Sequence, residues 1–253
     1  LDNLSNFKNN DFIKKDLSKF SIFIISKSGE TLETLTNFNI ILNNFKKRKK
    51  NISKNFIIIS ERNSVLFNFA RENNILFYEH NANLSGRYSV LSEVGLLMFN
   101  LDYKKIIQGI NSVLKKDLKK NLISNAANLL TLITKSKIDT HVSLIYSHSL
   151  LSYGYWHQQL LAESIGKNGK DFTPIISECP KDHHSIMQLY LDGKRNKFFT
   201  FFKIINDKKD LPIKDYFDQK FKKSSLNNII NAQFNATINV FKKNLIPFRV
   251  ILI

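Results

Sequence analysis

The sequence of 253 residues has few of the features that stabilise small secreted proteins or cross membranes. It contains one cysteine, Cys179, so no disulfide can form within the chain and a cysteine-based metal site is not expected. Packing is the expected role of this side chain. No apolar run approaches the roughly 18 residues that a membrane span needs, and the first residues, Leu1 to Leu4, lack the pattern of a secretion signal. A cytosolic, cytoplasmic location is therefore the expectation.

Proline and glycine are also scarce, with four and eight residues. No segment rich in proline, glycine or serine marks a linker, so a boundary between domains has to lie within continuous structured chain. The length allows one to two domains, and hydrophobic residues make up 43% of the sequence, which is enough to build cores. The chain is therefore expected to be globular.

Acidic residues are few beside basic ones, 21 against 38, which gives a net charge of +17. Such an excess raises nucleic acid as a partner, but the basic residues are scattered. The one dense block, 46–50, falls where an amphipathic helix should end, and cations there complement the helix dipole. The charge therefore reflects a general bias in composition. We expect neither nucleic acid nor a membrane as partner, although a positive field attracts anionic metabolites.

Short apolar runs alternate with amphipathic segments along the chain, which predicts parallel sheets covered by helices. In the first part, strands are predicted at 20–25, 55–60 and 75–78, with helices over 32–45, 63–73 and 90–100. Helices over 104–116 and 122–135 follow, and the succession then starts again, with strands at 141–146, 198–204 and 248–253 and a packing helix over 224–244. This repetition predicts two domains, 1–100 and 101–253.

The first predicted strand runs directly into a turn rich in hydroxyl groups. Residues 26–31, Ser-Lys-Ser-Gly-Glu-Thr, supply three hydroxyls, a lysine and a glycine just before a helix. Ligands bind at the carboxyl edge of parallel sheets, where a helix N-terminus offers unpaired N–H groups to an anion. This turn suits a phosphate monoester. An ordinary capped helix start is the alternative.

A helix rich in aromatic and amide side chains is predicted to present the carboxylate of Glu163. Its apolar face is expected to consist of Leu150, Tyr153, Trp156, Leu160 and Leu161. Gly166 and Gly169 would stop the helix, which places Glu163 in its last turn. Burial near the negative end of a helix raises the pKa of a carboxyl group towards the value that a general base needs, so Glu163 is the candidate base. A solvated acid paired with Lys167 is the alternative.

Two further motifs supply charged or titratable groups. Arg87 lies in the loop motif 85–89, and its permanently charged planar fork suits an oxyanion, with a solvated arginine as the alternative. His183 and His184 stand at a predicted helix start. Adjacent helical residues point about 100° apart, so they would not clamp one metal. One of them is a candidate acid or base, and a structural or exposed histidine is the alternative.

Four motifs together, in this order and spacing, resemble the phosphoglucose isomerase family. They are Ser-Lys-Ser-Gly-Glu-Thr at 26–31, Gly-Arg-Tyr-Ser at 86–89, Gln-Leu-Leu-Ala-Glu-Ser-Ile-Gly-Lys at 159–167 and His-Ser-Ile-Met-Gln-Leu at 184–189. The resemblance implies two sugar-isomerase (SIS) domains, each a parallel sheet flanked by helices in a three-layer sandwich. It also implies interconversion of glucose 6-phosphate and fructose 6-phosphate, through an enediolate, in glycolysis and gluconeogenesis, without metal or cofactor.

The resemblance assigns a role to each matching residue. For catalysis, it implies that Glu163 moves a proton between C1 and C2, that Arg87 lies beside the enediolate and that His184 takes part in ring opening. For substrate binding, it implies the phosphate loop and its neighbours, namely Ser26, Lys27, Ser28, Gly29, Glu30, Thr31, Gly86 and Gln159. In the family the histidine reaches the site from the neighbouring subunit, so a homodimer is also implied.

The sequence departs from the family at two places. A glycine-rich strand-turn before the phosphate loop and a lysine in a terminal segment are both absent, and the chain ends at Ile253 within a strand predicted to be buried. An internal fragment of a longer isomerase, lacking part of the sugar site, is therefore expected. A dual glucose and mannose 6-phosphate isomerase, a non-catalytic sugar-phosphate-binding regulatory domain and, from charge alone, a nucleic-acid binder stay open as alternatives.

Overall fold

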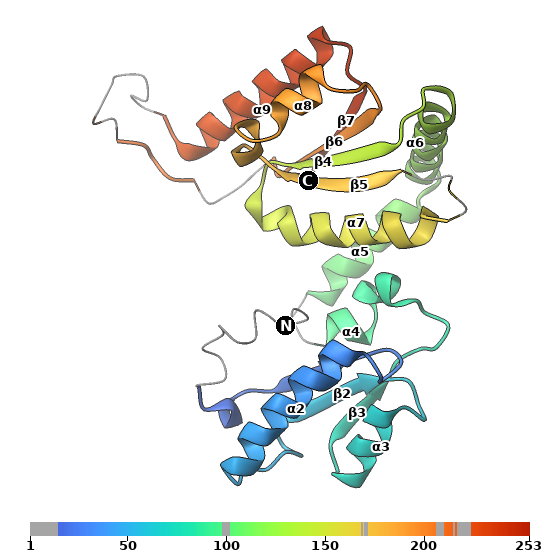
Figure 1. Ribbon diagram of the computed structural model, residues 1–253, viewed down its shortest axis with the longest axis vertical. Coiled ribbons are helices and arrows are strands. Elements are labelled where there is room, and N and C mark those ends of the chain that lie inside the picture. The colour runs from blue at the N-terminus through green and yellow to red at the C-terminus, as the bar shows by residue number, and fades with distance from the viewer. Residues whose placement is uncertain are drawn as a thin grey trace. The chain divides into compact units, whose positions relative to one another are not determined.

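The computed structural model of the chain describes residues 15–97, 102–167, 169, 172–205, 210–214, 216 and 224–253. The chain divides into two compact units, Leu1–Ile106 and Ile107–Ile253, and each is described by itself. Strands and helices alternate in both units, and neighbouring strands are parallel (Figure 1). The predicted α/β class, with parallel sheets flanked by helices, is therefore confirmed.

The first unit contains a sheet of three parallel strands in the order β1-β2-β3. The strands are β1 (Ile22–Ile25), β2 (Phe56–Ser60) and β3 (Leu76–Glu79). Helix α2 (Leu32–Lys47) connects β1 to β2, and helix α3 (Val65–Glu72) connects β2 to β3. Because parallel strands joined by crossover helices all run the same way, their carboxyl ends lie at one edge of the sheet. The turn after β1 and the segments after β2 and β3 therefore meet there.

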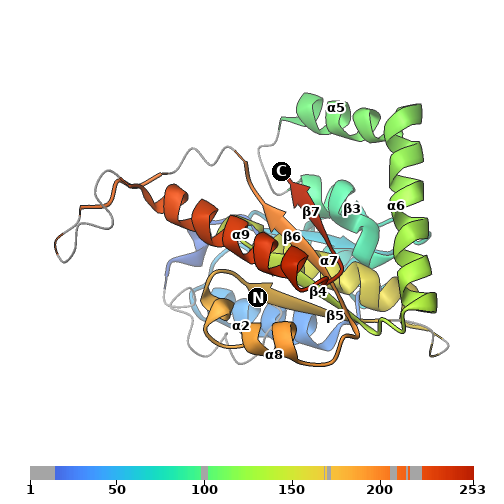
Figure 2. The same ribbon diagram turned by 90° about the horizontal axis from the view of Figure 1, so that it is seen from above.

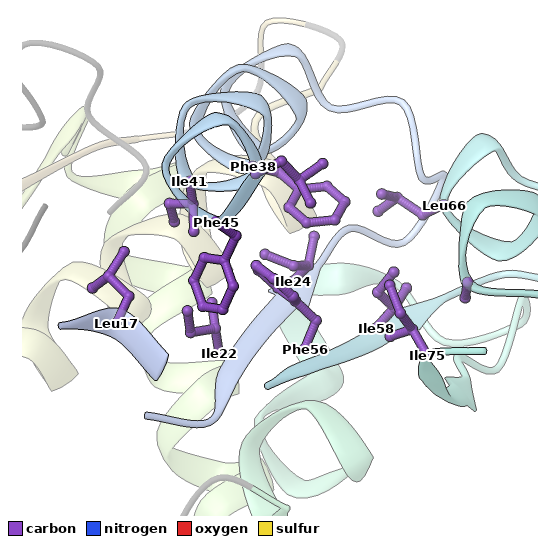
Figure 3. Packing of buried hydrophobic residues seen from close by; sticks show 12 residues of the cluster. Leu17, Ile22, Ile24, Phe38, Ile41, Phe45, Phe56, Ile58, Leu66 and Ile75 are labelled. Carbon is purple, nitrogen blue, oxygen red and sulfur yellow. The ribbon is translucent and has the colours of Figure 1, made fainter. Parts of the chain in front are cut away.

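One face of this sheet packs against α2 and α3. Phe38 and Phe45 of α2 contact Phe56 of β2, with ring centroids 5.3 and 4.8 Å apart. Figure 3 shows these rings between α2 and the strands, with Leu66 of α3 beside them. Burying one such side chain stabilises the fold by about 1.5–3 kcal/mol. The packing therefore holds α2 against the sheet, and with it the turn that precedes α2.

After β3 the structure differs from the prediction. Instead of a loop motif and a helix over 90–100, the chain forms the 3-10 helix η3 (Gly86–Leu91) and one helical turn, α4 (Glu93–Leu96). Ser92 separates them, because its hydroxyl accepts a hydrogen bond from the Val94 N–H and so starts a new helix. Serine side chains compete in this way with helix continuation. Residues 98–100 lie outside the described residues.

The second unit contains a sheet of four parallel strands in the order β5-β4-β6-β7. The strands are β4 (Thr140–Ile145), β5 (Thr173–Glu178), β6 (Lys197–Lys203) and β7 (Phe248–Leu252). Three of the four were predicted. The sequence gives little sign of β5 because Pro174 interrupts its apolar pattern. A proline is compatible with a strand at the edge of a sheet, and β5 is such a strand.

Helices cover both faces of this sheet (Figures 1 and 2). Helix α7 (Leu151–Ile165) packs on one face, where Tyr153 contacts Phe202 with ring centroids 5.5 Å apart. Helices α8 (Met187–Asp192) and α9 (Leu226–Lys243) pack on the other face. Successive side chains of a strand point to opposite faces, so Phe201, the neighbour of Phe202, contacts α9 instead. The second unit thus has three layers.

Three further expectations are resolved by the second unit. The terminal strand β7 is an edge strand and not a buried one, since Leu252 is 52% exposed. Cys179 is a buried free cysteine, as predicted. Helix α6 (Lys116–Lys135) begins earlier than the predicted 122, directly after α5 (Tyr103–Leu114). No residue of α5 or α6 is buried among the described residues.

None of the described helices is both long and apolar enough to pass through a bilayer.

Candidate functional site

The predicted phosphate turn lies at the carboxyl end of β1 and is organised around Ser26. The Ser26 hydroxyl accepts a hydrogen bond from the Gly29 N–H at 3.1 Å and lies 2.8 Å from the Thr31 hydroxyl. Ser28 accepts from the Glu30 N–H at 3.2 Å. Thr31 precedes α2 but makes no side-chain cap bond to it. The first amides of α2 therefore have no side-chain acceptor at that position, which suits an anionic ligand.

Gly29 gives the turn its shape. Its φ angle is +71°, in the left-handed region where only glycine is unstrained. A Cβ atom there would lie 2.5 Å from Cβ of Ser64 and 2.9 Å from the hydroxyl of Ser60. These two serines share a hydrogen bond of 2.6 Å between their hydroxyls, and Ser64 also caps α3. The turn after β2 therefore supports the turn after β1.

Lys27 is the predicted phosphate ligand whose surroundings differ most from the expectation. Its ammonium donates a hydrogen bond of 2.7 Å to the Ala82 carbonyl and lies 3.6 Å from the Glu61 carboxylate. The Glu61 N–H also donates to the Lys27 carbonyl at 2.9 Å. Lys27 therefore links the segments that follow β1, β2 and β3. Its ammonium is therefore already engaged by these groups.

Arg87 lies in η3 and is half-buried. Its guanidinium donates a hydrogen bond of 2.9 Å to the Ser85 hydroxyl, and its Cζ atom is 4.8 Å from the centroid of the Tyr88 ring. The stacked ring limits where the side chain can point. A Cβ atom at Gly86 would meet nothing within 4 Å, so packing does not explain that glycine.

The structure joins Gln159 and Glu163 in α7. The Gln159 amide donates a hydrogen bond of 2.7 Å to the Glu163 carboxylate, as residues four apart on one helix face can. The helix ends at Ile165, with Gly166 as its C-cap, so Glu163 lies in the last turn as predicted. Both side chains are exposed, however. The burial on which the argument for a general base relied is therefore not present in the second unit taken by itself.

The two adjacent histidines have different environments. Both follow β5 in the short 3-10 helix η5 (Lys181–His183) and its C-cap, not at the start of a longer helix. His183 is half-buried, lies 2.7 Å from the Tyr146 hydroxyl, and has a pKa that burial lowers. His184 is exposed. Of the two, His184 is the more exposed to solvent.

Glu163 and His184 lie near opposite ends of the strands of the same sheet. Helix α7 starts after the carboxyl end of β4 and runs back to the edge where β5 begins, so Glu163 lies near the amino ends of the strands. His184 follows the carboxyl end of β5. The 15 residues of α7 span about 22 Å. The second unit of one chain therefore does not bring the predicted base and the predicted ring-opening group together.

The sequence analysis did not identify a buried polar cluster that joins β4, β6, β7 and α7. His141 Nε2 lies 2.7 Å from the Thr200 hydroxyl, which also accepts a hydrogen bond of 3.0 Å from Arg249. His157 of α7 packs against His141, with ring centroids 5.6 Å apart. Burial, reinforced by the positive charge of Arg249, lowers the pKa of His141 to about 3 and that of His157 to about 4. Both rings are therefore neutral near pH 7.

A second pair that the sequence analysis did not identify lies near Arg87. His80 follows β3 and is 3% exposed, and its Nδ1 atom lies 2.5 Å from the carboxylate of Glu93 in α4. Burial by itself raises the pKa of Glu93, but hydrogen bonds from His80 and the nearby backbone outweigh it and lower that pKa. In the sequence, the one sign of this contact is that two titratable residues flank the motif 86–89.

The second unit also has a cavity of about 290 Å³ between α7 and β5. None of the predicted site residues lines it. The lining residues are Leu151, Tyr155, Gln158, Ile175, Ile176, Glu178, Lys181 and Asp182. Within the described ranges, no group of three or more histidine, cysteine, aspartate or glutamate residues could hold a metal ion.

Comparison with known sequences gives a single consistent family. Residues 3–237 match the family described as phosphoglucose isomerase. A probable glucose-6-phosphate isomerase of Methanococcus maripaludis is 35% identical over 98% of this chain and 58% of its own length. The glucose-6-phosphate isomerase of Methanocaldococcus jannaschii is also 35% identical, over 98% of this chain and 63% of its own. The chain thus spans about three fifths of the length of the curated relatives it matches.

Solved structures share the fold. A hypothetical protein from Thermus thermophilus superposes with a TM-score of 0.83 at 23% identity, over 95% of this chain and 62% of that one. A glucose-6-phosphate isomerase from Chlamydia trachomatis superposes with a TM-score of 0.72 at 18% identity, over 95% of this chain and 48% of that one.

Proposed function

Because the chain belongs to the phosphoglucose isomerase family, we propose that the protein interconverts glucose 6-phosphate and fructose 6-phosphate as an aldose-ketose isomerase. The observation that carries this proposal is the match over residues 3–237, which includes the phosphate turn, Arg87, Glu163 and His184. We also propose that residues 1–100 and 101–253 belong to two SIS domains and that the protein works in the cytoplasm in glycolysis and gluconeogenesis. Because the chain spans about three fifths of the length of its relatives, the test uses the complete protein.

In this proposal the turn after β1 binds the phosphate of the substrate. Ser26, Ser28 and Thr31 bring three hydroxyls together, and the amides at the start of α2 add donors for the phosphate oxygens. The helix dipole favours the negative charge at this end. Gly29 keeps the backbone close enough to approach the ligand. The turn fixes the phosphate end of the sugar, and orientation of the distant reacting carbons follows from it.

Glu163 acts as the base. Its carboxylate takes the proton from C2 of the open-chain aldose as the C1 carbonyl becomes an enediolate oxygen. The hydroxyl proton on O2 passes to O1, and as the C2 carbonyl forms, the protonated Glu163 returns its proton to C1. One carboxylate therefore serves both directions of the reaction. The hydrogen bond from Gln159 restricts the orientation of the carboxylate. Substrate binding has to supply the desolvation that the exposed side chain lacks.

Arg87 stabilises the enediolate. Negative charge develops on the substrate oxygens when the proton leaves, and a guanidinium lowers the energy of that charge without donating its own proton. The bond to Ser85 and the stacked Tyr88 ring reduce the freedom of the Arg87 side chain before the substrate binds. A fixed charge needs little reorganisation in the transition state, and this is the main source of its effect.

His184 opens the sugar ring of a substrate bound to the partner subunit of a homodimer. The exposure of His184 and its position at the sheet edge opposite Glu163 support this arrangement. An imidazole can protonate the ring oxygen and then take up the proton of the C1 hydroxyl, so one side chain can carry out both proton transfers. Two subunits would then share each active site.

The experiment that tests the proposal measures conversion of fructose 6-phosphate by the complete protein and by its Glu163→Gln variant. We expect the variant to lose about four orders of magnitude in kcat and all exchange of the C2 proton, while affinity for the sugar phosphate stays within about threefold. Glu72→Gln is the matched control, because Glu72 is also an exposed glutamate in the last turn of a helix. Retained proton exchange in Glu163→Gln would remove Glu163 from the mechanism.

The same assay separates the alternatives. If the complete protein binds the sugar phosphate but converts none of it, the regulatory-domain interpretation replaces the isomerase. If mannose 6-phosphate is converted as well, the protein is a dual isomerase. Binding to duplex or single-stranded nucleic acid that weakens as salt is added would support the remaining alternative, a nucleic-acid binder.

A further inference from the structure

Two side chains, His80 and Glu93, join the two ends of the segment 80–93 that carries Arg87. His80 and Glu93 are 13 positions apart in the sequence, yet the His80 Nδ1 atom and the Glu93 carboxylate lie 2.5 Å from each other. His80 is buried at the carboxyl end of β3, where its N–H also donates to the Ser60 carbonyl at 2.8 Å. It therefore belongs to the rigid sheet, and Glu93 is the point at which the segment returns to that sheet.

Hydrogen bonds continue from Glu93 towards Arg87. The Ser92 hydroxyl donates to the Ser89 carbonyl at 2.7 Å, and the Ser89 hydroxyl donates to the Gly86 carbonyl at 2.6 Å. Each bond spans three residues and fixes one turn of helical backbone. The turns of η3 and the start of α4 thus form one connected piece. A shift of Glu93 away from His80 would be passed on to Arg87.

On the other side of Arg87, Lys27 connects the segment to the phosphate turn. Its ammonium donates to the Ala82 carbonyl at the start of the segment. Asn81, Ala82 and Asn83 are exposed. The His80–Glu93 pair is therefore an attachment that does not depend on whether the phosphate turn is occupied.

We infer that His80 and Glu93 are positioning residues that hold Arg87 in place for the reaction. Neither is a catalytic residue in this account, because they act through the η3 backbone and not on the substrate. The inference rests on the proposed function for its kinetic consequence, whereas the attachment itself is a property of the protein without substrate. Loss of the attachment would let the guanidinium move away from the developing enediolate while the phosphate turn stays intact.

The test compares Glu93→Ala, which removes the contact, with Glu93→Gln, which keeps an oxygen that can accept from His80. Glu79→Ala is the matched control, since Glu79 is the neighbour of His80 in sequence and its partner is the exposed Arg62. We expect Glu93→Ala to lower kcat by about 100-fold with KM for fructose 6-phosphate changed less than about threefold. Glu93→Gln should restore most of kcat, and Glu79→Ala should match the parent protein.

A second measurement does not require activity. Trypsin cleaves after arginine, so the rate of cleavage between Arg87 and Tyr88 in the folded protein, followed by mass spectrometry, reports opening of this segment. We expect cleavage at this bond to be about tenfold faster in Glu93→Ala than in Glu79→Ala, while cleavage within the exposed block 46–50 is equal in both.

The outcomes separate the two ideas. An inactive parent protein would remove the isomerase proposal, and the cleavage rates would still decide whether the pair holds the segment. Glu93→Ala with unchanged kcat, or with equal cleavage after Arg87, would overturn the inference. A lower melting temperature with kcat per folded molecule unchanged would also overturn it, because that result describes a purely structural role.

Discussion

Gly29 determines the geometry of the phosphate turn through the side chain it lacks. We predict that Gly29→Ala lowers the free energy of unfolding by about 2–4 kcal/mol, because alanine is strained at φ +71° and its Cβ would collide with Ser64. Relief of the collision displaces the turn, so affinity for fructose 6-phosphate should fall at least about tenfold. Urea unfolding and equilibrium binding measure the two effects.

Gly109 is the matched control for this substitution. It lies in the exposed helix α5, and a Cβ atom there would meet nothing within 4 Å. Gly109→Ala should leave binding unchanged and raise the stability by up to about 1 kcal/mol, since alanine favours helix interiors. Equal losses of stability in the two variants would mean that the turn has no special backbone requirement at Gly29.

Single residues show what a motif does and does not predict. The hydroxyl pattern of 26–31 was enough to predict a compact turn before a helix, because serine and threonine make short local hydrogen bonds wherever the chain turns. The exposure of Glu163 and the different surroundings of His183 and His184 could not be predicted. These properties depend on which elements pack nearby, and the spacing of residues in the sequence does not reveal their neighbours in space.

At the scale of elements, the histidine cluster makes the contact of α7 with its sheet sensitive to acid. His141 and His157 have a pKa of 6.5 when unfolded and of about 3 and about 4 when folded, so the unfolded chain binds more protons between these values. The contribution of these two histidines to stability should therefore be constant above about pH 6.5 and fall as the pH drops towards 4, by up to about 1.4 kcal/mol per pH unit for each group.

The variant that isolates this effect is His157→Phe, which keeps an aromatic ring against Tyr153 and cannot take up a proton. We expect its free energy of unfolding to depend less steeply on pH between 6.5 and 4 than that of the parent protein. His148→Asn is the control, because His148 lies on the surface with its side chain 84% exposed. Parallel pH profiles for His157→Phe and the parent would contradict the assignment.

Helices and strands were predictable where a single periodicity of hydrophobic residues dominated the sequence. The apolar runs of β1, β2, β4 and β6 and the helical spacing of α2 and α9 gave the right type of structure within a few residues. The prediction failed at β5, where Pro174 breaks the run, and over 90–100, where Ser92 restarts the helix. In both places a single residue interrupts the periodic pattern from which the structure was predicted.

At the scale of the whole molecule, the proposed sharing of active sites between subunits predicts complementation. A mixed dimer of Glu163→Gln and His184→Ala subunits would have one site in which both residues are intact. Random pairing makes half of the dimers mixed, so co-expression should recover about one quarter of the parent activity. The measurement is the activity of the unfractionated co-expressed mixture, in which different tags on the two subunits show that mixed dimers form.

Each variant alone should be inactive in the same assay, which provides the baseline. Recovery would require the two residues to come from different chains, consistent with their positions at opposite sheet edges in one unit. If the mixed dimers form but no activity returns, Glu163 and His184 act within the same chain and the proposed dimeric site is wrong.

The strand orders have a consequence for how the chain folds as it is synthesised. The sheet of the first unit uses strands that lie consecutively between Ile22 and Glu79, whereas β6 waits for β7, whose first residue, Phe248, is 49 positions beyond its partner Phe199. Pairing between distant residues is slow, and ribosomes add residues at about 5–20 per second. The three described strands of the first sheet have therefore emerged seconds before β7, and until β7 pairs with it, β6 has an open edge that a chaperone or a neighbouring nascent chain can reach.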